Sequence, residues 1–263
     1  MNGKADENIF AEERKQIIVE IVNTNEKTTV AELCDRFSVS PATIRNDLRD
    51  LEDAGLLKRT HGGAISKKRA TFEPNAYQKE VERMQQKRAI ARMAAAYVNE
   101  GDSIAIDTGT TAFEFSKQLT DFKNLTVVTN DLQIASYLER NAHAEIIMAG
   151  GEIRRNFHCT AGKRAVDSIK DLNVDRSFIA ANGLSIKKGL TTPNSDNAYF
   201  KKELVTMGSE VVLLADSSKM DKTSFVRFAG VGDVDVLITD DEADPEYLAT
   251  LRELGMTVEI CGV

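Results

Sequence analysis

Five short polar segments in the second part of the sequence carry side chains that could bind a small anionic molecule. They are DTGTT (107–111), TND (129–131), GGEIR (150–154), NGLS (182–185) and DSSK (216–219). Lysine and arginine in these segments could neutralise a phosphate, while aspartate and asparagine could hydrogen-bond sugar hydroxyls. Each segment is also an ordinary turn or helix start, because Asp, Ser, Asn and Gly favour such positions. Their repetition along the chain favours a binding site.

The first seventy residues carry a different chemistry, centred on SPATIRNDL (40–48). Ser40 is a good helix cap and Pro41 fits the first helical position, so a helix is expected to begin here. Ile44 and Leu48 would face a core, which leaves the polar side chains outward. Arginine can bond a guanine edge or a phosphate, and asparagine can pair with adenine. The candidate DNA-binding residues, including four from a following basic segment, are Ser40, Thr43, Arg45, Asn46, Arg49, Lys58, Arg59, Thr60 and His61.

The charged face of that helix could also be simply solvated, as it would be on an isolated helix. The charge distribution along the chain favours DNA. Residues 36–69 hold eight basic and four acidic side chains, and residues 1–69 are neutral overall. The net charge of −7 therefore lies in residues 70–263. An acidic protein with one basic segment is compatible with DNA binding by that segment.

Local patterns predict how the first domain positions these side chains. Helical periodicity predicts helices over 11–24 and 29–37, followed by the helix that starts at Pro41. Two short strand-like runs then flank the Gly-Gly pair at 62–63, which suits a turn that needs positive φ. Three helices followed by a β-hairpin is the order of a winged helix-turn-helix, an α+β domain predicted over residues 1–69.

The pattern changes after a charged, proline-containing linker predicted over residues 70–80. A long helical stretch is expected over 77–98, and short apolar runs rich in Val and Ile then alternate with helical segments. These runs are SIAID (103–107), NLTVVTN (124–130), AEIIMAG (144–150), VDRSFIAAN (174–182), EVVLLAD (210–216), VDVLITD (234–240) and TVEICGV (257–263). Runs without polar alternation are typical of parallel strands covered on both faces. Residues 81–263 are therefore predicted to form an α/β domain with a mostly parallel sheet, and the polar segments follow the C-terminal ends of its strands.

The composition argues against several other classes of protein. The three cysteines and three histidines lack zinc-ligand spacing, although His158 and Cys159 are adjacent, so reduced thiols, no metal and no cofactor are expected. No stretch approaches the roughly 18 to 20 apolar residues of a membrane span. The polar start also lacks the pattern of a signal peptide. A cytoplasmic protein with no membrane partner is expected.

The first domain resembles the DNA-binding domain of the DeoR family of bacterial transcriptional regulators. Arg14, Ile18 and Val22, then SPATIRND with Leu48 after a gap of seventeen residues, fit that family's pattern, as does LEDAGLLKRTHGGA (51–64). The second domain resembles the family's sensor domain through DTGTT, VVTND, AGGEIR, ANGLS, GLTTP and LLADSSK, in that order. The resemblance implies a fold similar to that of ribose-5-phosphate isomerase and acetyl-CoA transferases. It also implies a phosphorylated sugar or sugar derivative as effector.

Carried over to this sequence, the resemblance assigns effector binding to polar, basic and glycine residues near the strand ends. They are Asp107, Gly109, Thr110, Thr111, Asn130, Asp131, Gly151, Arg154, Asn182, Lys202 and Lys219. The chain departs from the family at one place. The family often has a Glu-Ala pair before the helix that continues here as YFKKELV, whereas this chain has Asn197 and Ala198.

Three hypotheses follow. The favoured one is a transcriptional repressor of a sugar-utilisation operon, which binds operator DNA as a homodimer or homotetramer and responds to a phosphorylated sugar. An alternative is a sugar-phosphate isomerase-like enzyme with a DNA-binding appendage. The amide of Asn197 cannot act as a base at neutral pH, which weakens that alternative, and no catalytic residue is identified. A third hypothesis is constitutive DNA binding with a vestigial sensor domain.

Overall fold

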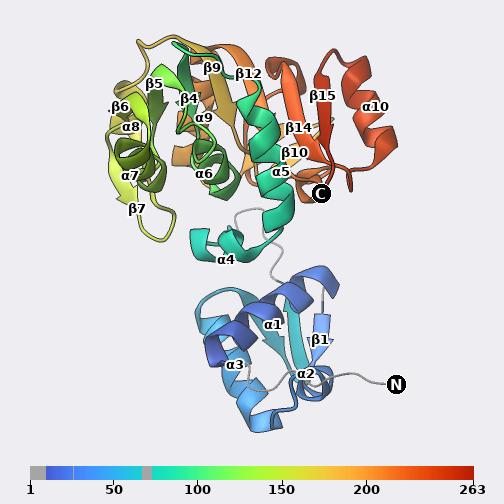
Figure 1. Ribbon diagram of the computed structural model, residues 1–263. Helices are drawn as coiled ribbons and strands as arrows, with labels where there is room; N and C mark the ends of the chain where they lie inside the picture. The colour runs from blue at the N-terminus through green and yellow to red at the C-terminus, as the bar shows by residue number, and fades with distance from the viewer. Residues whose placement is uncertain (1–9, 26, 67–72) are drawn as a thin grey trace. The chain divides into compact units, whose positions relative to one another are not determined.

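The computed structural model describes residues 10–25, 27–66 and 73–263 of the chain (Figure 1). These residues form two compact units, one that precedes residue 73 and one that runs from Glu73 to Val263. Each unit has its own apolar core. No helix within the described ranges is both long and apolar enough to cross a membrane.

The smaller unit contains three helices and a three-stranded antiparallel sheet. Its elements are α1 (Ala11–Asn25), β1 (Lys27–Thr29), α2 (Val30–Phe37), α3 (Pro41–Asp53), β2 (Leu57–Thr60) and β3 (Gly63–Ser66). The side chains of Ile44 and Leu48 on α3 pack with those of α1 and α2 in one core. β2 and β3 form the predicted hairpin, while β1, which the sequence did not predict, pairs with β3. The winged helix-turn-helix fold predicted from the sequence is confirmed.

Local interactions explain where α3 begins and why the first residue of β3 is a glycine. The hydroxyl of Ser40 accepts a hydrogen bond from Thr43 N at 3.2 Å, and Pro41 takes the first helical position. Neither Gly62 nor Gly63 has the positive φ that the turn was expected to need. Instead, a Cβ atom on Gly63 would lie 1.9 Å from the carbonyl oxygen of Thr28 on β1. Glycine is required here by the close approach of two strands.

The larger unit is built around a seven-stranded sheet in the order β15-β14-β12-β9-β4-β5-β6. Every neighbouring pair is parallel. The strands are β4 (Ser103–Ile106), β5 (Lys123–Thr129), β6 (His143–Met148), β9 (Val174–Ile179), β12 (Gly208–Leu214), β14 (Val236–Asp240) and β15 (Thr257–Cys261). They correspond to the seven apolar runs predicted as strands, so the α/β class is confirmed.

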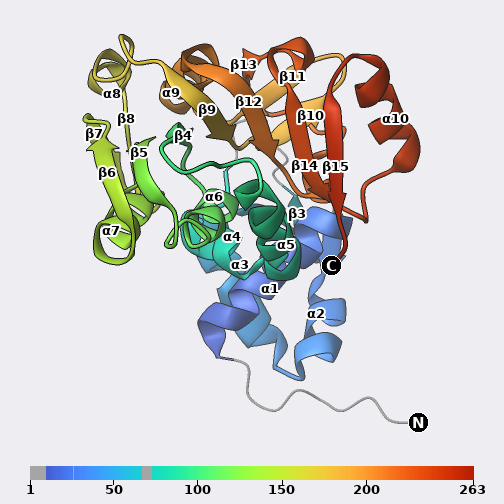
Figure 2. The same cartoon turned by 45° about the horizontal axis from the view of Figure 1, so that its top comes forward.

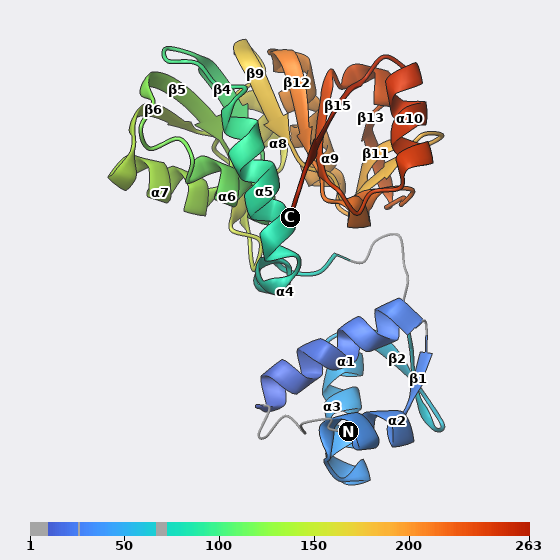
Figure 3. The same cartoon turned by 45° about the vertical axis from the view of Figure 1, so that its right-hand side comes forward.

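Helices cover both faces of this sheet, as Figures 2 and 3 show. The helices are α4 (Ala76–Val81), α5 (Met84–Ala95), α6 (Thr110–Ser116), α7 (Leu132–Asn141), α8 (Lys163–Asp167), α9 (Ser195–Met207) and α10 (Pro245–Glu253). α5, α6 and α7 pack on one face, with Phe115 and Ile134 in their core. α8, α9 and α10 pack on the other face, with Leu204 and Leu251 in theirs. Burial on both faces explains why the strands lack polar alternation.

Short antiparallel strands complete the larger unit, and the sequence patterns did not reveal them. β7 (Glu152–Arg154) and β8 (Cys159–Ala161) form a hairpin, and β10 (Gly183–Ser185), β11 (Gly189–Thr192) and β13 (Val226–Ala229) form a small sheet. Each strand has three or four residues. That length is too short for a hydrophobic period to stand out.

The long helix expected over 77–98 is two helices, because the chain breaks at Arg83. Arg83 adopts a left-handed conformation with φ of 52°, and α5 starts after it in a new direction. The ammonium of Lys87 on α5 donates hydrogen bonds to the carbonyls of Lys79 and Glu82, which the break leaves without helical partners. The predicted linker is only partly described, since residues 70–72 lie outside the described ranges. Residues 73–81 belong to the larger unit rather than to a free linker.

Candidate functional site

A cavity lies at the C-terminal ends of the central strands of the larger unit. It holds about 930 Å³, counting the space open to solvent. Its walls include residues 108–111 after β4, residues 180–182 after β9 and residues 214–216 at the end of β12. From β4 the chain proceeds to β5 and β6 in one direction, then returns to β9 and β12 on the other side. The cavity therefore lies at the point where the strand order reverses, the usual ligand site of an open parallel sheet.

Six of the predicted effector-binding residues line this cavity. They are Gly109, Thr110, Thr111, Asp131, Asn182 and Lys219. The other five do not line it, namely Asp107, Asn130, Gly151, Arg154 and Lys202. Some of the polar loops predicted from the sequence therefore line the cavity, while other residues of those loops lie elsewhere.

Asn130, Gly151 and Lys202 are held away from the cavity for different reasons. The amide of Asn130 is fully buried and donates to the carbonyl of Thr160 at 2.8 Å. Gly151 has φ of 122°, and a Cβ atom there would lie 2.5 Å from the carbonyl oxygen of residue 161. Lys202 is exposed on α9, and its neighbour Lys201 lines the cavity instead. Position 201 is four residues after Asn197, so both residues share the inner face of the helix.

Asp131 joins the loop after β4 to the helix after β5. Its carboxylate accepts hydrogen bonds from Thr108 Oγ1 at 2.7 Å and from the backbone N–H groups of Gln133 and Ile134 at 2.9 and 3.1 Å. The last two bonds cap α7. Burial raises the pKa of Asp131, although these hydrogen bonds act against the rise. Asp131 thus fixes the shape of the cavity wall.

Lysine side chains supply most of the cations that line the cavity. Lys79, Lys87, Lys201 and Lys219 all line it. Lys79 pairs with Glu73, and Lys201 pairs with the buried carboxylate of Asp107. Lys87 and Lys219 have no carboxylate within ion-pair distance among the described residues. Burial lowers the pKa of Lys87 to about 8, and the like charges of Lys219 and Lys79 add to that decrease, while Asp216 acts against it.

The sequence analysis missed Lys79, Lys87 and Lys201 as cavity residues. Lys87 is three and four residues before the buried Ile90 and Ala91, so helical spacing places it on the apolar face of α5. A lysine on such a face needs either a partner or a ligand. The position of Lys87 could therefore have been predicted from the sequence. The helix break at Arg83, which places Lys79 beside the cavity, could not.

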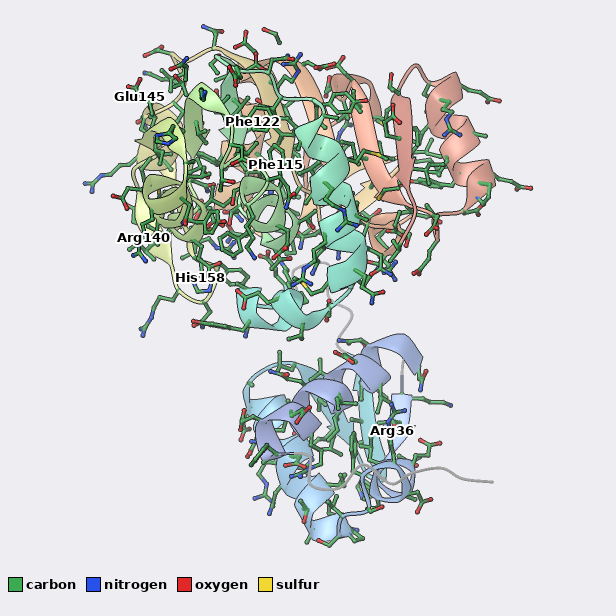
Figure 4. The ribbon with its side chains drawn as sticks, viewed as in Figure 1. Arg36, Phe115, Phe122, Arg140, Glu145 and His158 are labelled. Atoms are coloured by element: carbon green, nitrogen blue, oxygen red, sulfur yellow. The ribbon has the colours of Figure 1, made fainter. Side chains whose placement is uncertain are left out.

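Neutral polar atoms that lack a partner also line the cavity. Asn197 Oδ1 and His158 Nε2 are buried and make no hydrogen bond with the described residues. His158 lies in the loop between β7 and β8 (Figure 4). Buried polar atoms without partners are uncommon in native proteins, and a ligand or water can satisfy them. Cys159 is adjacent, and burial raises the pKa of its thiol to about 11.

The predicted DNA-binding residues lie on the outward surface of α3 and the hairpin of the smaller unit. Ser40, Arg45, Asn46, Arg49, Lys58, Thr60 and His61 are exposed, and Thr43 and Arg59 are half-buried. The Ser40 and Thr43 hydroxyls are hydrogen-bonded to each other at 2.9 Å. Arg36, which the sequence analysis did not single out, is exposed near the end of α2 (Figure 4).

Two carboxylates hold this surface in place. Asp47 on the inner side of α3 forms an ion pair with Arg14 of α1, with Nε and Oδ2 2.7 Å apart. Glu52, near the end of α3, accepts a hydrogen bond from the backbone N–H of Arg59 on β2 at 2.9 Å. The first contact fixes α3 against the core, and the second fixes the hairpin against α3.

Family models match the two units separately. Residues 14–70 match the model of the DeoR-like helix-turn-helix domain, and residues 82–241 match that of the DeoR C terminal sensor domain. Among solved structures, ribose 5 phosphate isomerase A from Neisseria gonorrhoeae is 18% identical, with 51% of this chain and 52% of that chain covered and a TM-score of 0.38.

Relatives of similar length extend over nearly the whole chain. The HTH-type transcriptional regulator GlpR of Haloferax volcanii is 38% identical over 246 residues, which are 94% of this chain and 96% of that protein. The HTH-type transcriptional regulator GolR of Listeria innocua is 32% identical, with 96% and 99% covered. The HTH-type transcriptional repressor GlcR of Bacillus subtilis is 29% identical, with 94% and 95% covered. The chain therefore belongs to the DeoR family, with a DeoR-like helix-turn-helix domain followed by a DeoR C-terminal sensor domain.

Proposed function

We propose that this chain is a DNA-binding transcriptional regulator that represses a sugar or sugar-derivative utilisation operon. A phosphorylated sugar or sugar derivative that binds in the cavity of the sensor domain modulates its DNA binding. The observation that carries this proposal is the presence of Lys87 and Lys219 in the cavity without carboxylate partners among the described residues. Lys87 is buried and Lys219 is half-buried, and the nearby carboxylate of Asp216 forms no ion pair with either of them among the described residues. A desolvated ammonium without a direct partner is costly, and an anionic ligand supplies that partner.

The effector's phosphate binds among the lysines of the cavity in this proposal, where Lys87 and Lys219 are cations without a carboxylate partner in the described ranges, and neutral groups bind the rest of the ligand. Asn182 and Asn197 line the same cavity with amide groups that suit sugar hydroxyls, and the unpartnered Oδ1 of Asn197 accepts a hydrogen bond from one of them. Gly109, Thr110 and Thr111 form the wall that follows β4. Asp131 shapes this wall and is already committed to hydrogen bonds within the protein.

The smaller unit binds operator DNA with α3 in the major groove. Arg45, Asn46 and Arg49 are exposed on this helix and reach base edges or phosphates in such a position. The hairpin residues Lys58 and His61 contact the sugar-phosphate backbone. A single winged helix covers little DNA, so we propose a homodimer or homotetramer on repeated half-sites. Light scattering on the purified protein measures that state directly.

The sensor cavity binds its ligand without turning it over in this proposal. A nucleophile at Cys159 is disfavoured because the raised pKa of about 11 keeps the thiol protonated at neutral pH. The amide of Asn197 has no basic form at neutral pH. The proposed regulator therefore leaves the effector chemically unchanged.

A titration of sugar phosphates into the protein–DNA complex tests this function. Duplexes recovered from a random pool by binding to the full-length protein supply the operator, and fluorescence anisotropy reports its binding. At least one phosphorylated hexose, pentose, hexitol or amino sugar is expected to shift the affinity for DNA. If the effector's affinity differs between the free and the DNA-bound protein, the effector must change the affinity for DNA by the same factor. The same sugars without phosphate serve as the control. A complex that is indifferent to every phosphorylated compound contradicts the proposal.

A further inference from the structure

The first residues of the larger unit place a carboxylate of the protein itself against the cavity. Glu73 lines the cavity, and only 8% of its side chain is exposed. Its Oε1 lies 2.8 Å from Lys79 Nζ, and its Oε2 lies 3.0 Å from Arg154 Nη2. Arg154 itself does not line the cavity, but its ion-pair partner Glu73 does. Lys79 and Arg154 thus bind the carboxylate of Glu73 at a position where they could otherwise bind an anionic ligand.

Arg154 has further capacity for an anion. Its Nη1 atom is buried and makes no hydrogen bond with any part of the chain that the structure describes. Its guanidinium lies 4.0 Å from the centre of the Phe157 ring, which holds it in place. A single carboxylate from Glu73 therefore leaves one strong donor unused, whereas a phosphate has enough oxygens to accept from both nitrogens.

We propose that Glu73 is an intramolecular competitor of the effector's anionic group, and that the effector displaces it from Lys79 and Arg154. This inference rests on the proposed function, because it concerns the same cavity. A tethered carboxylate competes at high effective concentration, so it raises the effector concentration needed to occupy the cavity. An anion of charge near −2 that satisfies both cations and the free Nη1 displaces a carboxylate of charge −1.

The place of Glu73 in the chain gives this competition a regulatory consequence. Glu73 is the first residue of the larger unit, and the DNA-binding unit precedes it. The backbone nearby is attached to the β7–β8 loop, where Ala76 N donates to Asn156 O at 2.9 Å. The ring of Tyr77 packs against that of His158 with their centres 5.1 Å apart. Glu73, Ala76 and Tyr77 belong to one short segment. Displacing Glu73 therefore changes how that segment, which follows the DNA-binding unit in the sequence, is attached to the sensor domain.

Calorimetric titration of the full-length protein with inorganic phosphate tests the competition. Glu73→Gln removes the competing charge at nearly constant volume, so it is expected to bind phosphate about tenfold more tightly than the wild type. Glu80→Gln on α4 is the matched control, because Glu80 does not line the cavity. This control is expected to bind phosphate as the wild type does. Equal or weaker binding by Glu73→Gln, including no detectable binding by either protein, overturns the proposal.

A second variant separates competition from a general loosening of the cavity. Adding Arg154→Gln to Glu73→Gln removes a cation that the displaced carboxylate would release, so the gain in phosphate affinity is expected to disappear. A gain that persists in the double variant overturns the role of Arg154. Both variants are first shown to melt cooperatively. The result does not depend on the operator titration, since that experiment uses sugar phosphates on the wild-type protein and reads DNA binding.

Discussion

The ammonium of Lys201 and the carboxylate of Asp107 form a buried ion pair, with 5% and 0% of their side chains exposed. Asp107 also accepts hydrogen bonds from the backbone N–H groups of Thr108 and Ala180, at 2.8 and 2.9 Å. Lys201 donates to the carbonyl of Ala180 at 3.0 Å. This pair joins the loops that follow β4 and β9, which are the two sides of the cavity.

Asp107→Ala is therefore expected to destabilise the sensor domain rather than remove a ligand contact alone. Loss of the carboxylate leaves the Lys201 ammonium buried without a counter-charge, which costs about 3 to 5 kcal/mol. Calorimetric melting of the full-length protein measures the loss. The double variant Asp107→Leu with Lys201→Met removes both charges and is expected to recover much of the stability. A single variant that melts as the wild type does contradicts this role.

Asp47→Ala is expected to destabilise the DNA-binding domain and leave ligand binding unchanged. Arg14 donates to both carboxylate oxygens of Asp47, at 2.7 and 3.2 Å, and both side chains are buried. Leaving Arg14 unpaired costs about 3 kcal/mol, so operator binding falls because the domain unfolds. Asp50→Ala on the same helix is the control, because its carboxylate is exposed and its pair with Lys15 contributes about 1 kcal/mol or less. Equal melting temperatures for the two variants would refute the assignment.

The sequence predicted the elements that have a strong hydrophobic period. All seven strands of the parallel sheet could be found, because burial on both faces produces apolar runs that polar residues do not interrupt. The three helices of the winged domain were found from their apolar stripes and from the cap at Ser40. These features are local, so a single stretch of sequence contains the whole signal.

The parts that could not be predicted depend on contacts between distant residues. The choice of Lys202 instead of Lys201 came from reading a Lys-Lys pair without knowing which face of α9 is buried. Asp107 and Asn130 have the residue types of a sugar site, yet both are buried away from the cavity, where Asp107 accepts from Ala180 N and the Asn130 amide nitrogen donates to Thr160 O. The pairing of Glu73 with Arg154 spans 81 residues, and no local pattern reports it.

Arg45→Ala is expected to weaken operator binding while leaving the melting temperature and effector binding unchanged. Arg45 is exposed on the outward face of α3, opposite the buried Ile44 and Leu48. A lost contact with a base or a phosphate costs about 1 to 3 kcal/mol, which is about a tenfold to hundredfold loss of affinity. Arg140→Ala, on an exposed part of α7 in the sensor domain, is the matched control. Anisotropy titrations of both variants decide the matter, and wild-type affinity in Arg45→Ala would exclude this contact.

Phosphate binding is expected to weaken as the pH rises from 7 to 9, because Lys87 has a pKa of about 8 in the unliganded protein. Below this pKa the ammonium is present and attracts the anion, and above it the neutral amine does not. The pKa of Lys87 is lowered by folding from 10.5, so its contribution opposes stability below about pH 8 and this penalty is relieved as the pH rises towards 10.5. Ligand affinity and protein stability are thus expected to change in opposite directions through this group.

Proton uptake on phosphate binding isolates the part of this effect that belongs to Lys87. A bound dianion raises the pKa of the ammonium, so binding near pH 8 should draw protons from the buffer. Inorganic phosphate is mostly the dianion at that pH, and any proton that it loses on binding has the opposite sign. Calorimetry in buffers of different ionisation enthalpy measures this uptake. Lys87→Met should abolish it, while Lys219→Met should move it to higher pH, since the charge of Lys219 lowers the pKa of Lys87. Uptake that survives in Lys87→Met would mean that another group titrates, and Lys87 would then not be the cation that the phosphate meets.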